Sequence, residues 1–115
     1  MRLLSRDEFL KHPAPCVYSV SWGVNSMCFE GPLLKTENLE NDWYYMDFKT
    51  WENDGSHSYN DNFDQMLINK ASFPIEDIVG RDGMFDYDCV YLVYDDSDVR
   101  KMIELLSETL KNDEL

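Results

Sequence analysis

The segment that most constrains the fold is Cys89–Tyr94, which reads CVYLVY. Successive side chains of a β-strand point to opposite faces of the sheet, and both faces of this segment are apolar. A strand of that kind needs cover on both sides, which favours a position inside a sheet over one at its edge. We therefore expect Cys89–Tyr94 to be a central strand.

Three segments upstream have the pattern of an antiparallel meander. Residues 16–22, CVYSVSW, alternate apolar and polar side chains. The turn residues GVNS then lead into a second strand, MCFEG, as in a β-hairpin. The third strand is expected at residues 42–51, DWYYMDFKTW. With the central strand, these segments predict an antiparallel sheet of about four strands.

Helix signals lie before, between and after these strands. Ser5 and Glu8 form a capping box, which predicts a short helix at residues 6–11. The segment DNFDQMLINK follows a turn-rich loop at residues 53–61 and predicts a second, amphipathic helix. A final helix is indicated by an apolar stripe of Val99, Met102, Ile103, Leu106 and Leu110. The chain is thus expected to be one α+β domain, residues 1–115, with two to three helices packed on one face of the sheet.

Acidic residues are concentrated in the middle of the chain. The net charge is −13, and residues 36–99 hold sixteen acidic residues against three basic ones. A surface of this kind repels nucleic acid and acidic membranes, and it attracts basic proteins or cations. Net charge also serves solubility alone. Direct nucleic-acid binding is therefore disfavoured.

Some of these acidic residues have a local explanation and others do not. Those at 95, 96 and 98 fall at the start of the final helix, where carboxylates satisfy unpaired N–H groups and favour the helix dipole. Asp82, Asp86 and Asp88 lie in the loop before the central strand and have no such role. They are candidate contacts to a partner, together with Asp47 and Asp54.

The strand at residues 42–51 has aromatic side chains on both faces. One face, with Tyr44, Met46 and Phe48, is expected to point toward the core. The other face carries three large aromatic residues: Trp43, Tyr45 and Trp51. Either a loop or helix covers these rings, since monomers seldom expose large apolar patches, or the rings form a partner-binding face with the composition of an interface hot spot.

The sequence contains no motif for catalysis or for a cofactor. The loop around Gly55 has Thr50 where a calcium loop needs its first ligand and Asp61 where it needs glutamate. His12 and His57 lack a neighbouring activated nucleophile. The three cysteines are widely spaced, which predicts reduced thiols. We therefore expect a non-enzymatic protein without metal or cofactor.

Three stretches resemble small proteins encoded by bacteriophages and prophages. They are LLSRDEFLKHPA, WYYMD and RDGMFDYDCVYLVYDDSDVRKMI, and they are spread over most of the chain. The resemblance implies an accessory phage gene product and carries over no catalytic residues. Several acidic phage proteins of this size block host defences, some by imitating the charge pattern of nucleic acid.

Charge, aromatic content and resemblance together predict a non-catalytic inhibitor of a basic, nucleic-acid-handling host protein, such as a CRISPR effector. Its carboxylates would occupy the Lys/Arg groove that binds nucleic-acid phosphates. The expected contacts are Trp43, Tyr45, Asp47, Trp51, Asp54, Asp82, Asp86 and Asp88.

Two alternative functions stay open. One is an immunity protein or antitoxin that neutralises a basic toxin, and the other is a nucleotide binder or metal-dependent enzyme.

The chain has no apolar run of signal-peptide or membrane-helix length. A cytoplasmic protein is expected, monomeric or homodimeric, in the host cell if it is encoded by a phage.

Overall fold

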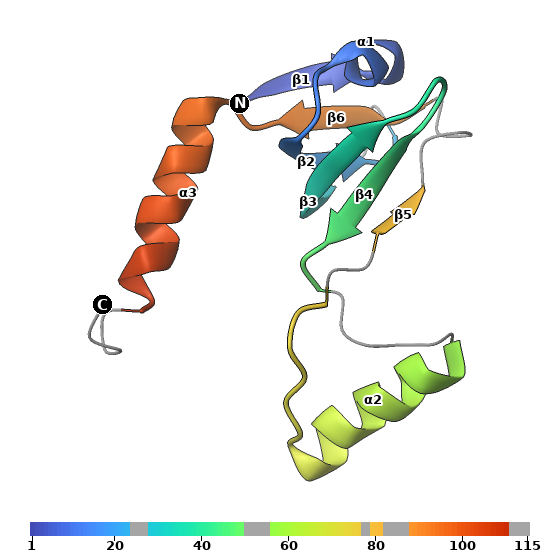
Figure 1. The fold of residues 1–115 in the computed structure, drawn as a ribbon, viewed down its shortest axis with the longest axis vertical. Coiled ribbons are helices and arrows are strands. Elements are labelled where there is room, and N and C mark those ends of the chain that lie inside the picture. The colour runs from blue at the N-terminus through green and yellow to red at the C-terminus, as the bar shows by residue number, and fades with distance from the viewer. Residues whose placement is uncertain (24–27, 50–55, 77–78, 82–87, 111–115) are drawn as a thin grey trace.

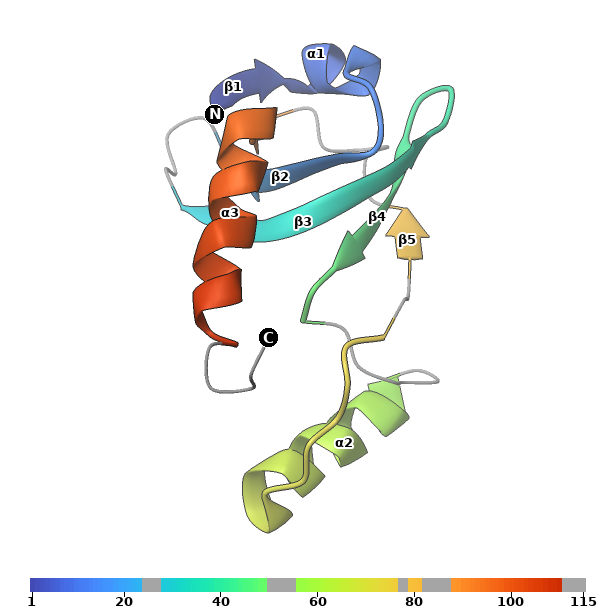
Figure 2. The same ribbon diagram turned by 60° about the vertical axis from the view of Figure 1, so that its left-hand side comes forward.

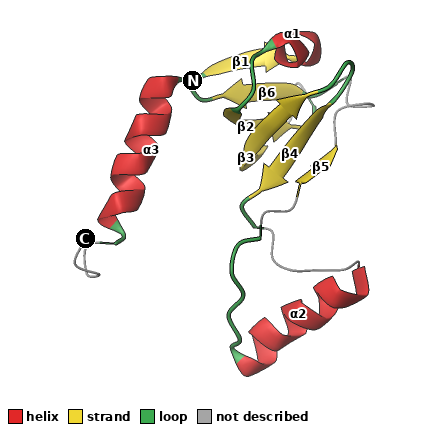
Figure 3. Cartoon of the chain, in the orientation of Figure 1, coloured by secondary structure: helices red, strands yellow, loops and turns green. Residues whose placement is uncertain are grey.

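The computed structural model describes residues 1–23, 28–49, 56–76, 79–81 and 88–110. Within these ranges the chain forms an α+β fold of six strands and three helices, with the strands gathered in one sheet (Figure 3). In chain order the elements are β1 (Arg2–Ser5), α1 (Arg6–Lys11), β2 (Cys16–Ser21), β3 (Phe29–Asn38), β4 (Trp43–Asp47), α2 (Ser56–Asn69), β5 (Val79–Arg81), β6 (Val90–Val93) and α3 (Asp96–Glu108).

The strands form one open antiparallel sheet in the order β1-β6-β2-β3-β4-β5. β2, β3 and β4 are the expected meander, and β6 lies inside the sheet between β1 and β2, as its two apolar faces predict. The sheet has two strands more than the sequence indicated, β1 and β5, one at each edge. They have four and three residues, too few to display a recognisable alternation of side chains.

An aromatic cluster joins α1 to the sheet and forms the centre of the core. Phe9 of α1 is completely buried, and its ring stacks on Tyr91 of β6 with centroids 4.5 Å apart. Trp43 of β4 meets Phe9 edge-on at 4.9 Å. Aromatic pairs of this kind contribute about 0.5–1.5 kcal/mol beyond the area they bury. The cluster therefore fixes α1 against β6 and β4.

α1 begins at the capping box that the sequence predicts. The Glu8 N–H donates to Ser5 Oγ at 3.2 Å, and the Ser5 N–H donates to Glu8 Oε1 at 2.9 Å. Each bond satisfies an N–H group that the first turn leaves without an intrahelical partner. The helix spans Arg6–Lys11 as expected.

β4 buries side chains on both of its faces, since Met46, on the face expected to point toward the core, is 9% exposed, and the opposite face lies against the aromatic cluster. Trp43 is 1% exposed, and Tyr45 packs against the same aromatic cluster. Of the two possibilities that the sequence left open for this face, cover by a helix is therefore confirmed for Trp43, and Trp43 is not available as a partner contact. The physical reason is that Phe9 covers the indole ring while Tyr18 Oη accepts a hydrogen bond of 3.2 Å from Trp43 Nε1, so both the ring and its N–H have partners inside.

α2 and α3 do not pack on the sheet in the expected way. None of the residues of α3 is buried, and the described side chains of α2, residues 60–69, are half-buried or exposed. Figure 1 shows both helices lying apart from the strands, and Figure 2 shows the same for α2. α2 also begins at Ser56, inside the segment expected to be a loop. Of the three helices described, only α1 contributes to the buried cluster.

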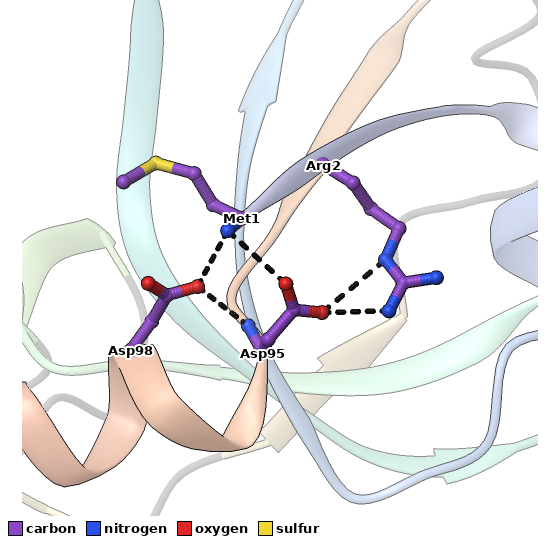
Figure 4. A network of polar contacts seen from close by, with 4 residues as sticks. All are labelled: Met1, Arg2, Asp95 and Asp98. Carbon is purple, nitrogen blue, oxygen red and sulfur yellow. Dashed lines mark hydrogen bonds and ion pairs between the residues drawn. The ribbon is translucent and has the colours of Figure 1, made fainter.

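A network of charges holds the start of α3 beside the start of β1 (Figure 4). Arg2 Nη2 donates to Asp95 Oδ1 at 2.7 Å, and the amino nitrogen of Met1 lies 2.6 Å from Asp98 Oδ2. Asp98 also accepts the Asp95 N–H at 2.8 Å. The hydrogen bonds from Arg2 and from the amino group lower the pKa of Asp95. These two acidic residues thus have the local, helix-capping role that the sequence predicts.

Candidate functional site

The residues predicted to contact a partner do not form one surface. Trp43 belongs to the core, and Tyr45 is half-buried against it. Asp47 ends β4 and accepts the Lys49 N–H at 2.8 Å. Asp88 is exposed just before β6, and two strands, β2 and β3, separate β6 from β4. The remaining four predicted contacts lie outside the described residues: Trp51, Asp54, Asp82 and Asp86.

α2 presents a surface in which acidic and apolar side chains alternate. Phe63 is 50% exposed, Leu67 58% and Ile68 72%, and the exposed carboxylates of Asp61 and Asp64 lie beside them. We call these five residues the α2 surface. At 3.6 residues per turn they occupy one side of the helix. The range Ser56–Asn69 contains neither lysine nor arginine, so the charged members of this surface are all anionic, and Lys70, just after the helix, donates from Nζ to Leu67 O at 3.2 Å.

α3 has a second exposed apolar surface. The α3 stripe is the set Val99, Met102, Ile103, Leu106 and Leu110. Ile103 is 59% exposed, Leu106 64% and Leu110 46%, whereas Val99 and Met102, nearer the sheet, are half-buried. An amphipathic helix normally buries such a stripe. Contiguous exposed apolar surface of this kind marks an interaction site in a soluble protein.

A cleft of about 530 Å³ opens where α3 leaves the sheet. One wall comes from the α1–β2 connection and the strands, with Pro13, Val17 and Leu34, and the other comes from the chain at Tyr94 and Val99. These groups make the interior largely apolar. The polar side chains of His12, Asp96 and Arg100 also line the cleft.

The titratable groups of the cleft do not form an activated nucleophile among the described residues. Burial raises the pKa of the Cys16 thiol to about 11, so the thiol is protonated at neutral pH and is a poor nucleophile. Burial, followed by the charge of Lys35, lowers the pKa of His12, so its imidazole is neutral there. Tyr94 Oη shares a hydrogen bond of 2.9 Å with Ser19 Oγ. The cleft is suited to receive an apolar side chain.

Among the described residues, more basic than acidic side chains are buried. Arg6 and Lys35 are buried, at 5% and 0% exposure, while Asp42 is the one carboxylate among the buried residues described. Lys35 Nζ donates to Phe9 O at 2.6 Å and to His12 O at 2.9 Å. The ammonium group therefore lies at the C-terminal end of α1, where the helix dipole favours a cation. The exposed surface is more acidic than composition alone indicates.

The described residues contain neither a cluster of metal ligands nor a helix that could span a membrane. In the part of the chain that is described, no group of three or more His, Cys, Asp or Glu side chains is placed to hold a metal ion. Within the same residues, no helix has both the length and the apolar character needed to cross a membrane. None of the three cysteines forms a disulfide.

Sequence reasoning missed the two helical surfaces because it assigned their apolar residues to the core. A stripe with helical spacing is the same signal whether the helix covers its own sheet or a partner. One further feature of the sequence could have indicated the α2 surface. Ser56–Asn69 contains neither lysine nor arginine, so no cation within the helix neutralises its carboxylates. The burial of Lys35 had no local signal, since it depends on α1, which is distant in the sequence.

In comparisons with protein-family models, with curated protein sequences and with solved structures, no match to the chain was found.

Proposed function

We propose that the protein is a non-catalytic, acidic inhibitor that binds a basic, nucleic-acid-handling protein in the cytoplasm of a host cell. This is the anti-defence role, anti-CRISPR-like and based on mimicry of nucleic acid, that the charge pattern and the phage resemblance led us to expect. The anchors of the contact differ from that expectation, because Trp43 lies in the core. In this proposal the α2 surface anchors the contact instead of Trp43.

The observation that carries this proposal is the α2 surface. Asp61 and Asp64 stand between the exposed side chains of Phe63, Leu67 and Ile68, on a helix that lies apart from the sheet in both views (Figures 1 and 2). Carboxylates without neighbouring cations attract a basic groove. Apolar side chains next to them add burial, which makes a contact durable once it has formed.

The mechanism is competition for a Lys/Arg groove. Proteins that track a nucleic-acid backbone do so with lysine and arginine side chains that neutralise phosphates. The carboxylates of Asp61 and Asp64 on α2 would occupy these side chains and exclude the nucleic acid. The apolar residues of α2 would pack against the aliphatic stems of the same lysines and arginines.

A salt-dependent capture experiment tests the proposal. Tagged protein is incubated with host lysate at about 0.1 M and at about 1 M salt, concentrations that bracket strong screening, and bound proteins are identified by mass spectrometry. We expect one basic nucleic-acid-binding protein at low salt and its loss at high salt. The captured protein should lose its nucleic-acid binding when the inhibitor is added. Capture of no such protein, or capture without loss of nucleic-acid binding, would contradict the proposal.

A charge-matched pair of variants assigns the contact to α2. Changing Asp61 and Asp64 together to asparagine should weaken binding to the captured protein on the order of tenfold, as expected for charges that steer and anchor a contact. Changing Glu37 and Glu40 together to glutamine removes the same charge from exposed positions at the end of β3 and in the β3–β4 connection and should alter affinity by less than about threefold. Equal losses in the two variants would show that net charge alone, and not the α2 surface, determines binding.

A further inference from the structure

The sheet has an outer face, which we define as the side turned away from the aromatic cluster. Tyr18 and Val20 of β2 point into that cluster, so the side chains that alternate with them point to the outer face, and so do their paired residues in β3. The outer side chains of β2 and β3 include Val17, Ser19, Ser21, Phe29 and Leu34. All five are uncharged, although the chain has a net charge of −13. An uncharged face on so acidic a protein is suited to burial rather than to solvent.

α3 turns its apolar stripe toward this outer face. Val99 lines the cleft together with Val17 and Leu34, so this side of the helix looks onto β2 and β3. At 100° per residue, Ile103 lies about 40° and Leu106 about 20° around the helix from Val99, so both point in nearly the same direction. The outer face and the α3 stripe are thus two apolar surfaces that face each other across the cleft.

The two surfaces approach each other most closely at the start of the helix. Val99 and Met102 are half-buried, whereas Ile103 and Leu106, further along, are 59% and 64% exposed. Figure 2 shows α3 in front of β2 and β3, and Figure 1 shows the helix standing apart from them. The gap therefore widens toward the C-terminal end of α3, as in a helix that is tilted away from a sheet about its first turn.

The junction between β6 and α3 can act as the pivot of this tilt. The Tyr94 N–H donates to Val17 O at 3.0 Å, and Tyr94 Oη shares its hydrogen bond with Ser19 Oγ, so the sheet side of the junction is fixed. Arg2 holds Asp95 on the helix side. None of the residues of α3 is buried, so rotation of the helix about Asp95 breaks no buried packing.

The length of the stripe matches the part of the sheet in front of it. Leu106 lies about 10 Å from Val99 along the helix axis, at 1.5 Å per residue, and two strand spacings also amount to about 10 Å. A helix closed on the outer face would therefore place its stripe over both β2 and β3. Closure would expel water from the cleft of about 530 Å³, and the removal of apolar surface from water favours the closed arrangement.

The tether and the charges favour α3 of the same chain over other occupants of the outer face. A helix attached through one short junction has a high effective concentration at the face that it adjoins. A second copy of the chain carries the same net charge of −13 and is repelled. A basic protein would find no carboxylate among the five outer side chains of β2 and β3.

We propose that α3 is a hinged arm that rotates about Asp95 and closes on the outer face of β2 and β3. The described arrangement is the open state, and the closed state predominates in the isolated protein. Closure covers Leu34 together with the α3 stripe, and it leaves the α2 surface accessible. The hinged arm does not depend on the proposed inhibition, which is carried by α2.

Nuclear Overhauser contacts between labelled methyl groups of the full chain test the proposal directly. In the closed state, the methyl groups of Leu106 and Ile103 pack on those of Leu34, and we expect contacts between them. In the open state Leu106 points into solvent and gives no such contact. A mixture of labelled and unlabelled chains, recorded so that only contacts between different chains appear, should show none of these contacts.

A matched pair of leucine variants separates the closed from the open state. Leu105 and Leu106 are 55% and 64% exposed in the open state, so that state predicts equal effects of Leu105→Glu and Leu106→Glu. In the closed state Leu106 is covered, whereas Leu105 lies about 120° around the helix from Val99 and stays in solvent. Leu106→Glu should then lower the hydrogen-exchange protection of the α3 amides about tenfold, and Leu105→Glu by less than about threefold.

A second pair of variants tests the sheet side of the contact. Val17→Thr keeps the branched shape that suits a strand and places a hydroxyl group in the cleft. It should lower the protection of the α3 amides on the order of fivefold, because closure would bury that hydroxyl. Val79→Thr, in the edge strand β5 where Val79 is 49% exposed, is the control and should leave α3 unchanged. Unaltered protection of the sheet amides checks that all four variants are folded.

Three results would overturn the hinged arm. One is the absence of methyl contacts between Leu106 or Ile103 and the outer face. Another is an equal loss of α3 protection in Leu105→Glu and Leu106→Glu. The third is the appearance of the methyl contacts between different chains of the mixed sample, which would make a second copy the occupant. Each of these results leaves the proposed inhibition untouched.

Discussion

At the scale of single residues, Lys35 shows how a charge can be held inside a small core. Its side chain is fully buried, and Nζ donates to two carbonyl oxygens at the end of α1. The ammonium also lies 4.2 Å from the centroid of the Phe9 ring, within the range of a cation–π contact. Burial nevertheless disfavours the charged form and lowers the pKa of Lys35 to about 8.

This lowered pKa predicts a rise in stability at alkaline pH. Between about pH 8 and about 10.5 the unfolded chain keeps the Lys35 proton that the folded chain has lost, so the free energy of unfolding increases with pH. The gain should be on the order of 1–3 kcal/mol by about pH 10.5. It is measured as the difference in unfolding free energy between the wild type and Lys35→Met, determined by urea denaturation at a series of pH values.

The comparison with Lys35→Met is needed because other groups titrate in the same range. The Cys16 thiol, whose pKa is raised to about 11, lowers stability as pH rises above its ordinary value, the opposite sign. Because the charge of Lys35 itself acts on the Cys16 pKa, both proteins are compared in a Cys16→Ala background, which removes the thiol from each. A difference curve that stays flat from pH 8 to pH 10.5 would disprove the assigned role of Lys35.

At the scale of elements, the pairing of β2 with β3 depends on a close approach of two backbones. The register shifts between Tyr18 and Val20, and Gly31 of β3 lies against the intervening Ser19. Gly31 has a φ of +139°, and a Cβ atom there would lie 2.6 Å from Ser19 Oγ. Side chains are disfavoured at this φ and excluded at this distance. Glycine is therefore required at position 31.

The substitution Gly31→Ala should destabilise the protein by about 1–3 kcal/mol through backbone strain and displacement of Ser19. Gly80→Ala in β5 is the matched control, since the nearest atom to its added Cβ is Tyr45 Cε1 at 3.4 Å. The control should change stability by no more than about 1 kcal/mol. Thermal denaturation of the three proteins under one condition provides the measurement, and similar melting temperatures for both variants would refute the argument.

Elements with local signals could be predicted, whereas those set by distant partners could not. The cap of α1 at Ser5 and Glu8 and the central position of β6 depend on residues close together in the sequence. The inward face of β4 depends on Phe9 and Tyr18, which supply the cover and the acceptor for Trp43. Alternation of side chains specifies two faces but does not say which one α1 will cover.

The charge of the surface was predictable, whereas the positions of the predicted contacts were not. Charge counts predict an acidic surface, and Asp47 and Asp88 are partly or fully exposed but lie on strands or segments that do not adjoin. The apolar residues of α2 and α3 were assigned to the core because an isolated helix gives no information about whether it has a partner in the same chain. Only the three-dimensional arrangement shows them exposed.

At the scale of the whole molecule, the excess of negative charge should limit stability at low ionic strength. Self-repulsion of a net charge of −13 destabilises the compact state and is screened by salt. The melting temperature should therefore rise between about 0.01 M and about 0.3 M sodium chloride.

A variant with Glu37 and Glu40 changed to lysine has a smaller net charge and should show a weaker rise. The control is the comparison of how steeply the melting temperature rises with salt in the two proteins. Salt effects unrelated to net charge are shared by both proteins and cancel in this comparison. A melting temperature that falls with salt in the wild type would mean that ion pairs such as Arg81 with Asp42, 3.1 Å apart, outweigh the repulsion.

The order of strands in the sheet has a consequence for synthesis on the ribosome. β1 pairs with β6, so Arg2 meets Val93 only after nearly the whole sheet-forming part of the chain has been made. The β2–β3–β4 meander closes through nearby residues and can form early, whereas β1 and α1 must wait for their neighbouring strand. Long-range pairing of this kind slows folding. A nascent chain that ends before residue 90 would leave Phe9, the centre of the aromatic cluster, without the ring of Tyr91 on which it stacks.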